Sequence, residues 1–237
     1  MFQRLRQWMG TPGDKSGAVL PPLLAHYPPY EAPHAGHGRQ LSLAQARENL
    51  AYFESVKDHR LACIAALLRS AANIDPEPAL HSPREHGAAL TDALDRWAAA
   101  QWPTLPAPQL PRLSAWLESS RRGPDIVYSM LLDLAILLGE VVRTGNADWS
   151  WGLDLDTSRL QAGLETARRT VLSADPVGAA TQPFLIDVES IVVGRYLMPA
   201  QSSWMRGADG GGPRSLNPWH RLVDEGLAGQ AMAAWRR

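Results

Sequence analysis

The stretch that decides the fold is Gly123–Thr144, GPDIVYSMLLDLAILLGEVVRT. An α-helix turns by about 100° per residue, and on that spacing the polar side chains of this stretch fall within an arc of about 80°. A helix whose remaining perimeter is apolar is typical of the centre of a fold, because most of its sides must be covered. We therefore predict a buried central helix. The residues in the polar arc are Asp125, Ser129, Asp133, Glu140 and Arg143, with Ile136 among them.

The two acids in the middle of this arc allow two interpretations. Asp133 and Glu140 are seven residues apart, so two helical turns place them on one face about 10 Å apart along the axis. They either form the one wet edge of the helix, solvated or paired with arginines such as Arg121, Arg122 or Arg195, or they are paired carboxylates in the interior. The second arrangement would mark a site. We favour the first, because no Glu-x-x-His pair, as used in helical carboxylate metal sites, lies in a predicted helix.

Composition narrows the class of protein. The chain has 237 residues, of which 45% are hydrophobic, so it can bury a sizeable core. Its 23 basic and 24 acidic residues give a net charge of −1. A general nucleic-acid binder needs an excess of positive charge for phosphate contacts, so we expect no nucleic-acid partner.

The location of the protein is predicted from what the sequence lacks. The only cysteine, Cys63, cannot form an intrachain disulfide and lies at an apolar helical position, which favours a small buried side chain. We find no run of about 18 uncharged apolar residues, so no membrane span is expected. The N-terminus has no apolar segment of the kind that secretory signals carry. We expect a cytoplasmic protein.

The chain divides into an arm and a domain. Residues 1–40 are rich in Pro, Gly and His, which favours an irregular arm that lies along the domain or on a partner. Residues 41–237 are predicted to form a single helical domain. Ahead of the central helix we expect one helix starting after Ser42, a second over 56–72, a third over 82–101 and a short one over 113–120.

Beyond the central helix the periodicity changes. Residues 149–156 alternate between large apolar and small or polar side chains, which indicates a strand, and residues 183–188 suggest a second. Residues 157–172 favour a helix, 189–197 are either strand or helix, and a last helix begins at Asn217-Pro218. The predicted fold class is mainly α, with a small antiparallel β-sheet at about 148–195 in the C-terminal half.

Catalytic motifs are missing from the sequence. It contains no G-x-S-x-G, no P-loop and no dinucleotide-binding glycine pattern. His34-x-x-His37 could ligate a metal if a third ligand arrived, but its loop setting favours a polar surface segment. We therefore expect no cofactor and no metal.

Nine tryptophans are many for this length. Five of them are interpreted as core or packing residues: Trp97, Trp102, Trp116, Trp149 and Trp151. Another three have weakly apolar surroundings, where an aromatic side chain is either core or an interface anchor: Trp204, Trp219 and Trp235.

Asp133, Gly139 and Glu140, followed nine residues later by Trp149 and a strand, carry a resemblance. In this respect the chain resembles uncharacterised bacterial proteins of the toxin-immunity type, in which a helix ending in Gly-Glu leads into a Trp-bearing strand. The resemblance covers about residues 125–197 and implies a bacterial immunity protein.

These features lead to one functional hypothesis and two alternatives. We predict a non-enzymatic binding protein, of the immunity or antitoxin type, that covers the basic active site of a secreted toxin. The alternatives are a metal-dependent or acid–base enzyme built on Asp133 and Glu140, and a structural adaptor in a larger assembly. The residues predicted to bind the partner are Asp133, Glu140, Asp148, Asp154, Asp156, Trp204 and Trp219.

Overall fold

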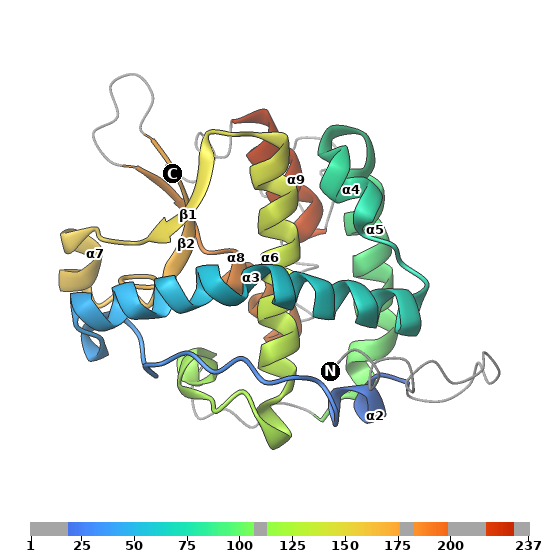
Figure 1. Cartoon of the computed structure of the whole chain (residues 1–237), viewed down its shortest axis with the longest axis horizontal. Helices are drawn as coiled ribbons and strands as arrows, with labels where there is room; N and C mark the ends of the chain where they lie inside the picture. The colour runs from blue at the N-terminus through green and yellow to red at the C-terminus, as the bar shows by residue number, and fades with distance from the viewer. Residues whose placement is uncertain (1–18, 107–112, 176–182, 199–216, 230–237) are drawn as a thin grey trace.

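The computed structural model describes residues 19–106, 113–175, 183–198 and 217–229. In them the chain is mainly α-helical with a small antiparallel sheet in its C-terminal half, as predicted. Figure 1 shows α6 upright in the middle, α3 across it, α4 and α5 on one side and the sheet on the other. The helices are α2 (Leu20–Leu24), α3 (Leu43–Ala72), α4 (Glu77–His81), α5 (Pro83–Gln101), α6 (Val127–Gly145), α7 (Thr157–Ala162), α8 (Val188–Leu197) and α9 (Pro218–Ala228). The strands are β1 (Trp149–Leu153), β2 (Thr170–Ala174) and β3 (Phe184–Ile186).

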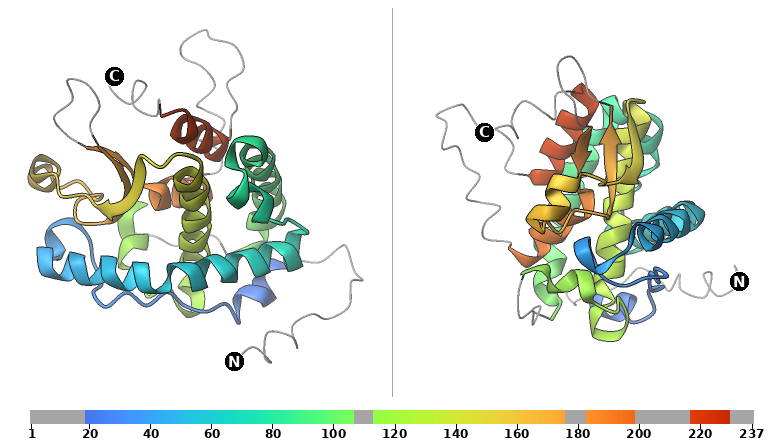
Figure 2. Two further views of the ribbon diagram at one scale, coloured as in Figure 1. Left: turned by 45° about the horizontal axis from the view of Figure 1, so that its top comes forward. Right: turned by 90° about the vertical axis from the view of Figure 1, so that its left-hand side faces the viewer.

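Helix α6 is the predicted central helix. Every residue from Val127 to Val142 is buried, because α3, α5, α8, α9 and β1 all pack against it. The two further views in Figure 2 show the same enclosure. The main hydrophobic cluster is centred on α6 and draws residues from every described helix except α7, and a smaller one joins Leu132 and Ile136 of α6 to Tyr30 and Phe53. No helix in the described part of the chain is long and apolar enough to cross a bilayer.

Helix α3 is one continuous helix of 30 residues, where two helices were predicted. No Gly or Pro interrupts residues 43–72, so the change of phase near Val56 alters the buried face without ending the helix. The predicted capping box is present, with Ser42 accepting from the N–H of Gln45 and Gln45 bonding back. Asn73 ends the helix in the left-handed conformation.

Helices α5, α8 and α9 enclose an aromatic cluster against α6. The ring of Trp102 makes edge contacts with Trp97, Tyr196 and Trp219 at centroid distances of 6.3, 5.6 and 5.5 Å. Trp219 is fully buried there. Trp116 and Trp149 are also buried, so the core interpretation holds for these tryptophans.

The sheet has the order β1-β2-β3, with Trp149 opposite Ala174 and Leu172 opposite Ile186. The helix predicted over 157–172 is wrong beyond Ala162. Gly163, in the left-handed conformation, ends α7, and Thr170–Ala174 pairs with β1 instead. Residues 189–197, left open between strand and helix, belong to α8.

The described part of the arm lies along its own domain. It begins with the short helix α2, which was not predicted, and buries Leu20, Leu24, Tyr27 and Tyr30. The arm then runs beneath α3 (Figure 1) into the 3₁₀ turn η1 (Gly38–Gln40). Three more 3₁₀ turns lie between α5 and α6 in the sequence: η2 (Trp102–Thr104), η3 (Leu113–Glu118) and η4 (Gly123–Asp125).

Candidate functional site

Asp133 lies in the interior where α6 meets α3 and the arm. Its side chain is fully buried. Arg60 donates from Nε to Oδ1 at 2.7 Å, and the hydroxyl of Tyr27 donates to Oδ2 at 2.6 Å. Asp133 is therefore a buried, ion-paired carboxylate. Its cation is Arg60 of α3, rather than one of the arginines named from the sequence.

Arg60 ties the arm to this carboxylate. Its Nη1 donates to the carbonyl oxygens of Pro28 at 2.9 Å and Pro29 at 3.2 Å. Its guanidinium group also lies over the rings of Tyr27 and Tyr30, 5.7 and 5.9 Å from their centroids. Because proline has no N–H, its carbonyl is the one backbone group that it can offer. One arginine thus binds four consecutive residues of the arm.

Ser129, one turn before Asp133, makes the second attachment of the arm. Its Oγ accepts from the N–H of Tyr30 at 2.8 Å and donates to the carbonyl oxygen of Arg121 at 2.9 Å. Ser129 is fully buried. The first half of the polar stripe of α6 therefore holds the arm in place.

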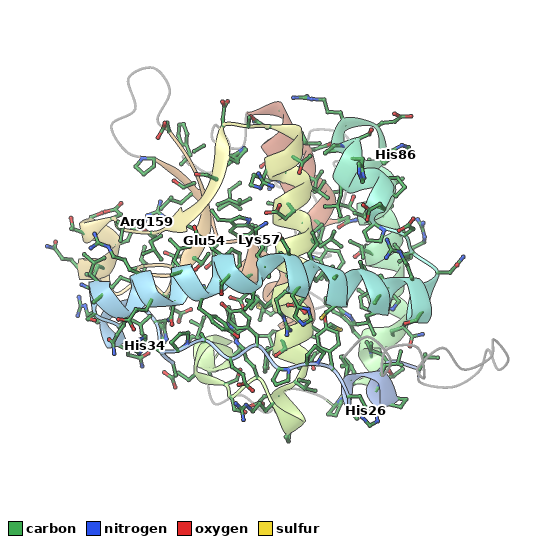
Figure 3. All side chains as sticks on the ribbon, in the orientation of Figure 1. His26, His34, Glu54, Lys57, His86 and Arg159 are labelled. Atoms are coloured by element: carbon green, nitrogen blue, oxygen red, sulfur yellow. The ribbon has the colours of Figure 1, made fainter. Side chains whose placement is uncertain are left out.

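Glu140 forms a separate cluster with β1 and α3. Trp151 donates its indole N–H to Oε1 at 2.7 Å, and Arg143 donates from Nη2 to Oε2 at 2.7 Å. The ammonium group of Lys57 lies 3.3 Å from Oε2. Figure 3 shows Lys57 on α3 near the crossing with α6. The second half of the stripe thus joins the sheet to two helices.

The two acids differ in how their surroundings affect ionisation. Burial raises the pKa of Asp133 to about 7, and Arg60 and Tyr27 lower it only in part. Burial would also raise the pKa of Glu140. However, the hydrogen bonds from Arg143 and Trp151, with the charge of Lys57, hold that pKa below its usual value. Glu140 is accordingly a stable carboxylate at neutral pH, whereas Asp133 titrates there.

Trp151 also determines the residue before Glu140. A Cβ atom built on Gly139 would lie 2.5 Å from Cη2 of Trp151 and closer still to Cζ2. Gly139 and Glu140, on which the expected resemblance rests, are therefore the docking point of Trp151. Trp149, the residue named from the sequence, instead donates its indole N–H to the carbonyl oxygen of Gly226. The pair also lies inside α6, which continues to Gly145.

The other acids predicted to bind a partner have different settings. Asp148 is exposed in the turn between α6 and β1. Asp154 is fully buried, accepts from the N–H of Asp156 and pairs with Arg159 at 3.5 Å. Asp156 caps the N-terminus of α7 through the N–H groups of its first turn. Asp154 and Asp156 therefore shape the loop around α7.

The tryptophans considered as interface anchors differ in what the structure describes of them. Trp219 is fully buried in the aromatic cluster and has no surface to offer. Trp204 and Trp235 lie outside the described residues. The predicted partner-binding set is thus dispersed over the interior, the α7 loop and the α6–β1 turn.

An arginine cluster escaped sequence reasoning. Arg121 and Arg169 share the carboxylate of Glu189, with Nη2–Oε1 and Nη2–Oε2 distances of 2.6 and 2.9 Å. Arg169 also pairs with Asp187 and lies 4.9 Å from the ring centroid of Trp116. The two Arg-Arg doublets, 121–122 and 168–169, were the visible signal in the sequence.

Both doublets line a cavity of about 260 Å³ between the arm, α3, α6 and the sheet. Ile136, which lies between Asp133 and Glu140 on α6, lines it as well. Glu31, Ala35, Ser120 and Arg122 are exposed, so this side of the cavity reaches solvent. The cavity combines buried charge with free volume.

The histidines form no metal site in the described residues, where no cluster of three or more metal-ligating side chains occurs. His34 bonds to Glu48 of α3 instead of acting with His37. Burial raises the pKa of the Cys63 thiol, so the thiol is less reactive than a free cysteine. These positions fit structural roles.

Comparisons with protein-family models, with curated proteins and with solved structures give no match for this chain.

Proposed function

We propose that this chain is a non-enzymatic binding protein that acts on a protein partner in the cytoplasm. The observation that supports it is the division of the acids into two groups. Asp133 and Glu140, the carboxylates best suited to chemistry, are enclosed by cations and hold the arm and the sheet in place. Other carboxylates remain exposed on the surface, where they are available for electrostatic recognition.

Three of the exposed acids lie on α3. Glu48, Glu54 and Asp58 are exposed there, and Glu54 has neither a hydrogen bond nor an ion pair within the described part of the chain. Figure 3 shows Glu54 near Lys57 on this helix. Glu54 and Asp58 are four residues apart and therefore share one face. A partner with a basic surface would find two exposed carboxylates, those of Glu54 and Asp58, on one face of a rigid helix.

The finer proposal is that the partner is a secreted toxin with a basic active site, which this chain covers. The resemblance to immunity-type proteins motivates it. Gly139 and Glu140, two of the residues on which that resemblance rests, form an internal attachment with Trp151, so they support the scaffold rather than the recognition surface. Recognition is accordingly assigned to α3 and to Asp148.

The test uses the protein encoded next to this gene as the partner. It is co-expressed with wild-type chain and with the Glu54→Lys/Asp58→Lys variant. Glu77→Lys/Glu85→Lys on α4 and α5 makes the same charge change elsewhere and serves as the control. We expect the neighbouring protein to arrest growth, the wild-type chain to restore growth, and the α3 variant to weaken binding by about tenfold or more.

A neighbouring product that is harmless, or that fails to bind the wild-type chain, would refute the toxin proposal. If both variants bind equally well, α3 is not the recognition surface. Light scattering on the purified chain tests the adaptor alternative in the same preparation, because an adaptor of that kind would self-associate or join a larger assembly.

A further inference from the structure

The cavity beside α6 carries an inference that does not depend on the proposed function. Three guanidinium groups surround it, those of Arg121, Arg168 and Arg169, and Arg122 at the rim is paired with Glu31. Arg169 is buried, and Arg121 and Arg168 are half-buried. A cation that is partly removed from water favours a nearby counter-charge, because desolvation of an unpaired charge is costly. The charge balance around the cavity therefore indicates what it can accept.

The balance leaves one positive charge unmatched. Arg121 and Arg169 are neutralised by the carboxylates of Glu189 and Asp187. Arg168 donates to the carbonyl oxygen of Leu41 and has no ion pair within the described residues. One added negative charge would complete the set.

Two of the arginines that line the cavity have left-handed backbone. Among the described residues other than glycine, Asn73, Arg121 and Arg168 have positive φ values, of 53°, 55° and 61°. Asn73 ends α3, where this conformation is common. Arg168 lies in the turn before β2, where its N–H donates to the carbonyl oxygen of Asp154, and Arg121 lies in the bend before η4. Left-handed backbone in a residue other than glycine costs about 1 kcal/mol or more. Both residues line this cavity.

The rest of the lining is suited to an aromatic group. Tyr30, Phe53 and Trp151 contribute rings, and Leu132 and Ile136 contribute aliphatic surface. The hydroxyl oxygen of Ser119 is buried in the lining without a hydrogen-bond partner. A dry apolar cavity of about 150 Å³ can hold benzene, so about 260 Å³ suffices for a ring with a short chain.

We propose that this cavity binds a small monocarboxylate with an aromatic body, whose carboxylate pairs with Arg168. The carboxylate supplies the single missing charge and accepts the bidentate donors of a guanidinium group. The ring lies on the aromatic part of the lining, and the free Ser119 hydroxyl provides an additional donor. A phosphate monoester, with nearly two charges, would leave an unmatched negative charge.

Isothermal titration calorimetry with the whole chain tests this with 3-phenylpropionate, its neutral amide and phenyl phosphate. We expect the carboxylate to bind with a dissociation constant near or below about 1 mM, and the amide to bind about tenfold or more weakly. Phenyl phosphate should bind more weakly than the carboxylate. This comparison uses the wild-type chain alone, so it does not depend on the folding of any variant.

Variants then locate the site. Arg168→Gln should weaken carboxylate binding by about tenfold, whereas Arg96→Gln, an exposed arginine on α5, should leave it unchanged within about twofold. Ala135→Leu, on the α6 side of the lining, should abolish binding by filling the cavity. Circular dichroism and melting curves establish that each variant is folded before it is titrated.

Several results would overturn the proposal. These are no binding of the carboxylate at about 10 mM, equal affinity for the acid and the amide, tighter binding of phenyl phosphate, and unchanged binding in folded Arg168→Gln. Loss of toxin binding in the α3 variant, with carboxylate binding retained, would separate the two proposals.

Discussion

Trp151 occupies the space that a side chain at position 139 would need. Glycine is therefore the residue that lets the indole ring pack this closely against α6. The ring then reaches the next residue, because its N–H bonds to Glu140 at 2.7 Å. Strand β1 is thereby attached to the central helix at one fixed point.

The first prediction concerns this close approach. Gly139→Ala should lower the free energy of unfolding by about 1–3 kcal/mol, because the new methyl group overlaps an aromatic ring and must displace it. The measurement is urea denaturation. Gly194→Ala in α8 is the matched control, since the nearest atom to its Cβ would be 4.0 Å away. That variant should be stabilised by up to about 1 kcal/mol.

Equal effects of the two glycine substitutions would show that Trp151 does not pack against Gly139.

The second prediction concerns the hydrogen bond of the same ring. Trp151→Phe should destabilise the protein by about 1.5–3 kcal/mol more than Trp97→Phe, because a bond to a charged carboxylate is lost. The indole nitrogen of Trp97 is buried without a partner, so its replacement removes ring area and no hydrogen bond. Chemical denaturation of both variants provides the comparison. A larger loss in Trp97→Phe would contradict it.

The third prediction concerns the arm. Tyr27→Phe removes the hydroxyl that donates to Asp133 and leaves that buried oxygen without this donor. We expect a loss of about 1–3 kcal/mol and faster proteolytic cleavage in residues 19–41. Tyr52→Phe is the control, because its hydroxyl makes no hydrogen bond within the described residues. Cleavage of the two variants at the same rate would mean that Tyr27 does not secure the arm.

The fourth prediction is a pH dependence set by Asp133. Its pKa is raised to about 7 in the folded chain, from about 4 in the unfolded chain. Between these values the folded state binds the extra proton, so stability must fall as pH rises, by up to about 1.4 kcal/mol per pH unit. Above pH 7 this contribution levels off. Urea denaturation at pH 5–8 should show wild type losing stability relative to Asp133→Asn.

Glu140 is the control, because its ionisation should change stability with pH in the opposite direction. Its pKa is lowered on folding, so its contribution is present above the unfolded value and is lost as pH falls through the folded one. Relative to Glu140→Gln, wild type should therefore gain stability as pH rises from acid and then remain constant. If wild type instead gains stability relative to Asp133→Asn as pH rises from 5 to 8, the charge of Arg60 outweighs burial and the pKa of Asp133 is not raised.

Local patterns in the sequence predicted much of the secondary structure. The period of apolar residues identified α6, and the Ser42-Gln45 box identified the start of α3. The alternation over residues 149–156 identified strand β1, which ends earlier, at Leu153. The errors arose where long-range contacts override local preference. The apolar spacing over residues 157–172 is helical, yet the end of this range, from Thr170, belongs to β2 because it pairs with β1.

The candidate site was predictable only in part. Periodicity placed Asp133 and Glu140 on one face of one helix, which is correct. It could not show that Ile136, between them, lines a cavity, or that the doublets at 121–122 and 168–169 meet there. The two doublets are far apart in sequence, and a spacing analysis treats each as an ordinary surface turn.

Helical period and composition were enough to establish a buried rod as the centre of a mainly helical chain, because burial of one element depends on the apolar residues it carries itself. The role of the charged residues on that helix was decided only by the tertiary structure. The partners of Asp133 lie 73 and 106 residues away, and whether an acid is solvated or paired depends on which distant groups exclude water from it.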